Sequence, residues 1–193
     1  MGMPKKAAAT RIPRDEGSER LIKAVLDLGR TGPIAKITVR DIAAAAGLQT
    51  MHLKRYFGSR NELLLAVSNR LMRQIVEAVA ERPLTEIFPI LLNNPDVALR
   101  LRIVNHLLDE GIAPDSFDSD RAVYLRIADR IAEVNLIDKR TARTYALIIQ
   151  LVLQGSQLMG DANGLNAKQR KDIFNLLVAL APELKDAETR LGW

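Results

Sequence analysis

A single glycine separates two short helical patterns at residues 38–57, which read TVRDIAAAAGLQTMHLKRYF. Gly47 stands where a tight turn needs a residue that tolerates positive φ, and Ala43, four residues earlier, is small enough for a second helix to cross closely. Apolar residues lie on both sides of the turn at helical spacing: Ile42, Ala46, Leu48, Leu53 and Phe57. The pattern predicts a helix-turn-helix, in which two helices meet at a steep angle and share one small core.

Helical periodicity continues along the rest of the chain, so we expect an all-α fold of about nine helices. Capping patterns precede three of these helices: Thr38 with Asp41, Ser59 with Glu62, and Asn166 with Gln169. We place helices near residues 15–30, 38–46, 50–57, 59–81, 84–92, 96–110, 118–135, 139–159 and 167–181, with Pro182 ending the last one. The predicted parts are a flexible basic arm at 1–13, a helix-turn-helix head at 14–61, a helical bundle at 62–182 and a tail at 183–193.

Composition excludes several classes of protein. The chain has 193 residues, 48% of them apolar and 26% charged, as expected of a folded globular protein. It lacks an apolar run of the roughly 18–20 residues that span a bilayer, and its N-terminus lacks an apolar signal core, so we expect a cytoplasmic protein with no membrane partner. With no cysteine and only two histidines, it offers no disulfide and no evident metal cage, and we expect neither a metal nor another cofactor.

Positive charge is concentrated in the first third of the chain. Residues 1–60 hold 12 Lys and Arg against 5 Asp and Glu, a surplus of seven, whereas residues 61–193 hold 16 against 18. The segment that contains the helix-turn-helix pattern is therefore the part that we expect to meet a polyanion.

The second helix of the pattern has a polar outer face. If Leu53 and Phe57 point inward, its N-terminal residues lead into a DNA major groove and its basic residues reach phosphates or guanine edges. This face comprises Gln49, Thr50, Met51, His52, Lys54 and Arg55. Arg60 begins the next helix, where a helix N-terminus and a guanidinium together form a phosphate site. Other interpretations stay open: the segment could be a solvated basic face, His52 an ordinary exposed histidine, and Tyr56 a core residue.

Residues 20–67 resemble the N-terminal DNA-binding region of the TetR family of bacterial repressors. The resemblance lies in Thr38-Val39-Arg40-Asp41-Ile42-Ala43, Ala46-Gly47-Leu48, Leu53, Tyr56-Phe57, Ser59-Arg60 and Glu62-Leu63. It implies an all-helical homodimer of about nine helices per subunit. It also implies a C-terminal region that binds a small ligand and thereby releases double-stranded DNA.

The resemblance also implies individual DNA contacts. Thr38 and Arg40 would touch DNA from the start of the first helix. The second helix would contribute Thr50, Met51, His52, Lys54, Arg55 and Tyr56, and Arg60 would take the place of a phosphate-binding lysine. Lys54 stands where the family usually has an aromatic residue, and the connection at residues 32–37 is about one residue longer than usual. Met51 and His52 stand where Gly and Thr are common, which suggests an unusual operator sequence.

The C-terminal two-thirds contains no catalytic constellation, so we expect no enzyme. Residues 139–159 carry two apolar strips, and a helix with so wide an apolar surface must bury two sides. The second strip is either monomer core or part of a dimer interface, in which this helix and the one at 167–181 from each subunit would form a four-helix bundle. The candidate interface residues are Leu151, Gly155, Leu158, Ile173, Leu177 and Leu180.

A ligand pocket is expected in the same region. Candidate lining residues are Met72, Ile75, Val79, Phe88, Leu91, His106, Leu107, Phe117, Tyr124, Tyr145 and Ile149, all of which would serve equally well as core. Their character suggests a largely apolar effector with few polar anchors.

The leading hypothesis is a ligand-responsive transcriptional regulator, a repressor released from a palindromic operator by a small apolar effector. The alternative is a non-enzymatic helical binding or scaffold protein whose basic head contacts RNA or an anionic surface.

Overall fold

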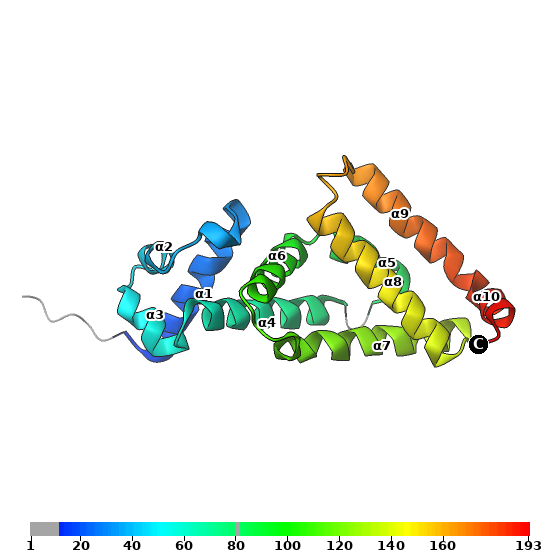
Figure 1. Cartoon of the computed structure of the whole chain (residues 1–193), viewed down its shortest axis with the longest axis horizontal. Helices are drawn as coiled ribbons and strands as arrows, with labels where there is room; N and C mark the ends of the chain where they lie inside the picture. The colour runs from blue at the N-terminus through cyan, green and yellow to red at the C-terminus, as the bar shows by residue number, and fades with distance from the viewer. Residues whose placement is uncertain (1–11, 80–81) are drawn as a thin grey trace, which may run out of the picture. The chain divides into compact units, whose positions relative to one another are not determined.

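The structure, a computed structural model, describes residues 12–79 and 82–193. Over these residues the chain forms ten α-helices, three short 3-10 helices and no strand, which confirms the predicted all-α class (Figure 1). It divides into two compact units, residues 1–66 and 67–193. The predicted basic arm at 1–13 lies, except for its last two residues, outside the described residues. None of the described helices is both long enough and apolar enough to cross a bilayer.

The first unit is built around one long helix, α1 (Arg14–Thr31). After the 3-10 turn η1 (Ile34–Lys36) come α2 (Val39–Ala45), α3 (Thr50–Phe57) and the start of α4 (Arg60–Val79). Helix α1 packs against both α2 and α3, and these two pack against each other (Figure 1). The apolar positions at helical spacing form the core: Leu21, Ala24, Val25, Ile42, Ala43, Ala46, Leu53, Leu63 and Leu64. The predicted helix-turn-helix is therefore present.

Gly47 makes the turn between α2 and α3 possible. Its φ is +65°, a conformation that costs glycine little. The Leu48 amide donates to the Ala43 carbonyl at 2.9 Å, and the Gly47 amide donates to the Ala44 carbonyl at 3.1 Å. These two bonds form a Schellman motif, which satisfies the last carbonyls of α2 while the chain reverses into α3.

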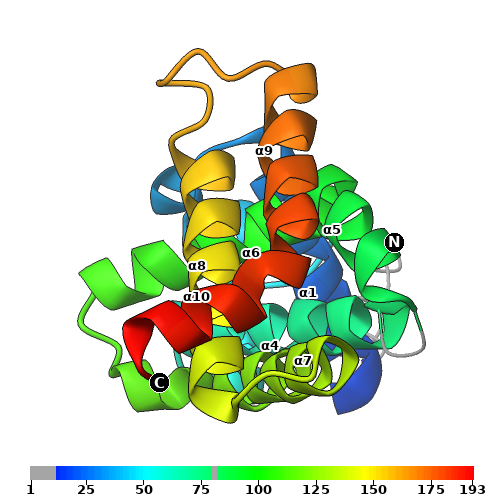
Figure 2. The ribbon, with the colours of Figure 1, turned by 90° about the vertical axis from the view of Figure 1, so that its right-hand side faces the viewer.

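The second unit is a helical bundle. It contains the rest of α4, then α5 (Leu84–Asn93), α6 (Pro95–Asp109), η2 (Pro114–Phe117), α7 (Asp118–Asn135), α8 (Lys139–Leu158), α9 (Ala167–Leu180), η3 (Ala181–Glu183) and α10 (Leu184–Leu191). Helices α8 and α9 lie side by side (Figure 2). The core between α7, α8 and α9 consists of Ala128, Ile131, Ala132, Ile137, Ala142, Tyr145, Ala146, Ile149 and Phe174.

The C-terminal residues differ from the sequence-based expectation. Pro182 does not end the helical part of the chain, because η3 holds it in its first turn and α10 follows. Proline is tolerated there, since the first amides of a helix have no partner within it. Helix α10 is anchored through Glu188. Its buried carboxylate accepts a hydrogen bond from the backbone amide of Asp138 at 3.3 Å.

Candidate functional site

The exposed face of α3 gathers polar and basic side chains. Leu53 is 2% exposed and holds the helix on the core, whereas Met51 is 63% exposed. The predicted contact residues that lie exposed on this face are Gln49, Thr50, Met51, Lys54 and Arg55. Gln49 stands at the N-cap, but its side chain makes no capping hydrogen bond. The exposed side chain of Gln49 is therefore not used to cap α3.

The start of α2 is fixed by a reciprocal cap. The Asp41 amide donates to the Thr38 hydroxyl at 3.2 Å, and the Thr38 amide donates to the Asp41 carboxylate at 2.9 Å. The Thr38 hydroxyl also donates to that carboxylate, and this bond, followed by the backbone one, lowers the pKa of Asp41 below its ordinary value. Thr38 thus holds the helix end, and Arg40, exposed in the first turn, is placed by it.

Tyr56 lies in the core rather than on the outer face of α3. Its side chain is buried against Gly17 of α1: a Cβ added at Gly17 would lie 2.5 Å from Tyr56 Cε2. Arg14 donates to the Tyr56 backbone carbonyl at 3.4 Å. Of the two interpretations of Tyr56 left open by the sequence, the structure favours the core residue that joins α1 to α3.

His52 occupies an intermediate position. It is half-buried, its ring centroid lies 5.7 Å from that of Tyr56, and its Nδ1 atom is buried without a hydrogen-bond partner. The imidazole therefore forms the edge of the α3 face, next to the core, and is not a fully solvated side chain.

Arg60 is held inside the first unit. Its Nε donates to the Ile37 carbonyl at 2.8 Å, and its Nη2 donates to the Ile34 carbonyl at 2.6 Å. These bonds tie the η1 segment to the first residue of α4. These bonds give the guanidinium a role within the first unit, so we assign Arg60 to positioning and leave it out of the DNA surface proposed below.

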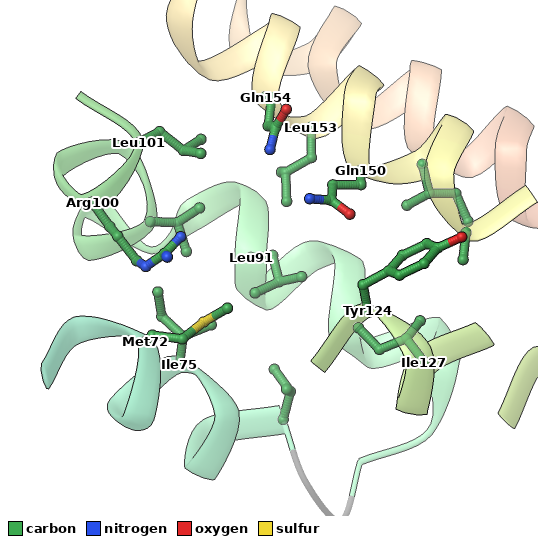
Figure 3. Close-up of a pocket in the computed structure, with 14 residues that line it drawn as sticks. Met72, Ile75, Leu91, Arg100, Leu101, Tyr124, Ile127, Gln150, Leu153 and Gln154 are labelled. Carbon is green, nitrogen blue, oxygen red and sulfur yellow. The ribbon is translucent and has the colours of Figure 1, made fainter. Parts of the chain in front are cut away.

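A cavity of about 120 Å³ lies within the second unit, between α4, α5, α6, α7 and α8 (Figure 3). Six of the predicted pocket residues line it: Met72, Ile75, Val79, Leu91, Tyr124 and Ile149. Leu107, Phe117 and Tyr145 are buried elsewhere, and His106 lies half-exposed on α6 outside the lining. The Tyr145 hydroxyl donates to the Leu177 carbonyl, and burial raises its pKa. The side chain of Phe88 lies outside what the structure describes.

The polar part of this cavity was not predicted from the sequence. Arg100 of α6 and two glutamines of α8, Gln150 and Gln154, line it together with Val97, Leu101, Ile127, Ala146 and Leu153. A signal was present, because the glutamines are four residues apart and fall on one face of the largely apolar stretch 145–155 of α8. Arg100 and Arg102 likewise interrupt an otherwise apolar run at residues 97–104, and of these two only Arg100 lines the cavity.

An apolar strip on α8 and α9 faces away from the bundle core. On α8 it consists of Leu147, Ile148, Leu151 and Leu158, and on α9 of Leu176 and Leu180. Leu151 is 57% exposed, and a Cβ added at Gly155 would meet nothing within 4 Å. Of the other predicted interface residues, Ile173 and Leu177 are half-buried. Exposed apolar side chains at this spacing are typical of a surface that another chain covers.

Across residues 12–79 and 82–193, no group of three or more histidines and carboxylates is placed to hold a metal ion.

Comparison with known families agrees with this geometry. Residues 21–67 match the model of the bacterial regulatory proteins of the tetR family. The matched segment runs from α1 through α2 and α3 into α4. No curated protein matches the chain.

Proposed function

Its residues 21–67 place this chain among the DNA-binding transcriptional regulators of the tetR family, and we propose that it is a repressor that a small effector releases from DNA. Two copies bind the two halves of a palindromic operator, with half-sites about 34–36 Å apart or a multiple of that distance. The protein acts in the cytoplasm, where DNA is accessible to it, and has no catalytic role.

The exposed face of α3 is the observation that carries the proposal. A helix of this size fits the major groove, where base edges present distinct hydrogen-bonding patterns. Gln49 and Thr50 lead the helix, and Arg55 follows one turn later with the fork of donors that suits guanine. Lys54 of α3 and Arg40 of α2 are exposed cations and are suited to phosphates. Met51 supplies an apolar contact of the kind that thymine methyl groups accept.

Homodimer formation is part of the proposal. The apolar strip of α8 and α9 supports it, because two such strips paired across a two-fold axis form a four-helix interface. Gly155 supports it as well, since nothing in its own chain requires a glycine there and a second helix can approach closely.

The response to an effector is the third part of the proposal, after DNA binding and homodimer formation. The cavity of the second unit supports it, since ligand sites are concave and mostly apolar with a few polar groups. An effector that binds one state of the dimer more tightly than the other shifts the population toward that state, and reciprocal linkage then lowers the affinity for DNA.

DNA binding by the Arg55→Ala variant tests the proposal. An operator is first selected from random duplexes, and its binding is measured by fluorescence anisotropy at several salt concentrations. Loss of a base contact of about 1–3 kcal/mol weakens specific binding about 5-fold to 150-fold. Lys23→Ala is the control, because it removes the same charge from an exposed position on α1, outside α3.

Other outcomes would contradict the proposal. If Arg55→Ala and Lys23→Ala lower the affinity for the operator equally, the head binds DNA only through its positive charge. Tight binding to RNA or to anionic vesicles, without selection of any duplex, would favour the scaffold alternative.

A further inference from the structure

A positive charge lies in the wall of an otherwise apolar and neutral cavity. Arg100 is 6% exposed, and its guanidinium points toward the interior, opposite the amides of Gln150 and Gln154 (Figure 3). The hydroxyl of Tyr124 is engaged elsewhere, since it donates to the Arg143 carbonyl at 2.6 Å. No aspartate or glutamate is among the described residues that line the cavity.

A guanidinium in such a place favours an anionic occupant. The Nε atom of Arg100 is buried without a hydrogen-bond partner among the described residues, although the residue makes other contacts within the protein, and a buried donor left without an acceptor is costly. Arginine has five N–H donors, so Arg100 can serve a ligand in addition to the contacts that it makes within the protein. Its planar fork matches a carboxylate with two parallel hydrogen bonds.

We propose that the cavity binds a small monocarboxylate with an apolar body. The carboxylate accepts hydrogen bonds from Arg100 and from the amide groups of Gln150 and Gln154. The apolar body packs against Met72, Ile75 and Leu91. This assignment rests on the proposed effector role of the cavity and names the chemical class of that effector.

The size of the cavity limits the apolar body. An apolar cavity of about 150 Å³ in another protein binds benzene, and this one measures about 120 Å³. One aromatic ring or a short alkyl chain therefore has about the right size for the apolar body. Benzoate and hexanoate are suitable probes.

Calorimetric titration of the full-length protein without DNA tests the ligand class. The probes are benzoate and hexanoate, with benzyl alcohol, 1-hexanol and hexylamine as neutral and cationic counterparts of similar shape. A charge-assisted hydrogen bond contributes enough for the carboxylates to bind about tenfold or more tightly than the alcohols, and hexylamine binds weakest. Equal affinity for carboxylates and alcohols, or tighter binding of the amine, would overturn the proposal without reference to any variant.

Variants of Arg100 test the residue assignment. Arg100→Gln removes the preference for carboxylates and leaves the affinity for the alcohols within about twofold, whereas Arg100→Lys keeps part of the preference because the charge remains. Arg102→Gln is the control, because it makes the same change two residues along α6 and outside the cavity. Equal weakening of both ligand types in Arg100→Gln would mean that Arg100 only maintains the cavity.

DNA release is measured separately, so that the two proposals can fail independently. Carboxylates that bind through Arg100 but leave operator binding unchanged would contradict the effector role in the proposed function while the ligand site stands. An alcohol or amine that releases the operator while carboxylates do not would contradict this inference while the effector role stands.

Discussion

At the scale of single residues, the contact between Gly17 and Tyr56 sets the distance between α1 and α3. A methyl group at position 17 would lie 2.5 Å from Tyr56 Cε2 and 3.1 Å from the Tyr56 hydroxyl oxygen. Since Tyr56 is buried, its ring cannot move without disturbing the packing of α3. Glycine is thus required at position 17 because a larger residue would clash with Tyr56, and not because of its backbone conformation.

We expect Gly17→Ala to lower the free energy of unfolding of the head by about 1 kcal/mol. Overpacking costs about 1–3 kcal/mol, and the better helix propensity of alanine returns part of it. Thermal or urea unfolding measures the change. Gly32→Ala is the control, because its φ of −148° suits any residue and the nearest atom to its Cβ is 3.7 Å away. A Gly17→Ala head more stable than wild type would contradict the steric argument.

Arg60 is a second residue whose role can be decided by measurement. Because two backbone carbonyls accept its N–H groups, Arg60→Ala should lower the stability of the head by about 1.5–3 kcal/mol per lost charge-assisted bond, with some recovery by water. The slope of log K against log salt in DNA binding should stay the same. If Arg60 contacted a phosphate instead, stability would be unchanged and the slope would fall by about one.

At the scale of helices and turns, the cap of α2 makes the start of the helix-turn-helix depend on pH. Bonds from the Thr38 hydroxyl and then the Thr38 amide lower the pKa of Asp41, so the folded state favours the charged carboxylate. A lowered pKa stabilises the fold above the ordinary value of 3.8, and that contribution is lost as the pH falls through the lowered value.

Titration of the Asp41 carboxyl carbon by NMR should therefore give a midpoint below 3.8. In Thr38→Val, which removes the larger cause, the midpoint should move back toward the ordinary value. The same variant should lose about 1 kcal/mol of stability at neutral pH, because the N-cap is gone. A midpoint that does not respond to Thr38→Val would mean that the capping hydroxyl does not hold the carboxylate in solution.

The helices of this chain could be predicted because their signals are local. Caps such as Thr38 with Asp41 and Asn166 with Gln169 lie within one turn, and both capping boxes are present in the structure. Gly47 likewise specifies its turn through its own backbone. The missed helix α10 follows a proline that can equally end a helix or begin one, and nothing local distinguishes the two.

The site was less predictable because its residues depend on distant partners. Tyr56 is a core residue because Gly17, 39 positions earlier, leaves room for its ring. Arg60 turns inward because the carbonyls of Ile34 and Ile37 lie within its reach. Arg100 lines the cavity through the packing of five helices. Periodicity says which face of a helix is buried, but not which side chain a neighbouring helix places opposite.

At the scale of the whole molecule, the apolar strip of α8 and α9 connects self-association with operator binding. If two copies pair through this strip, a charge placed in its centre must be buried or the dimer must open. Burying an unpaired carboxylate costs several kcal/mol, so we expect Leu151→Glu to give a monomer by sedimentation. Gly155→Leu should also weaken the dimer, since a Cβ added at Gly155 meets nothing within 4 Å in its own chain and the larger side chain would keep a partner helix from approaching closely.

Leu191→Glu is the control for this prediction, because Leu191 is an equally exposed leucine on α10, outside the strip. The dimer prediction extends to DNA. A monomer holds one half-site, so Leu151→Glu should bind a full palindrome no more tightly than a single half-site, whereas wild type gains from linking the two contacts. Arg55→Ala should do the reverse, weakening both sites while its mass stays that of a dimer. An unchanged mass for both Leu151→Glu and Gly155→Leu would mean that the strip has another occupant and that operator symmetry arises elsewhere.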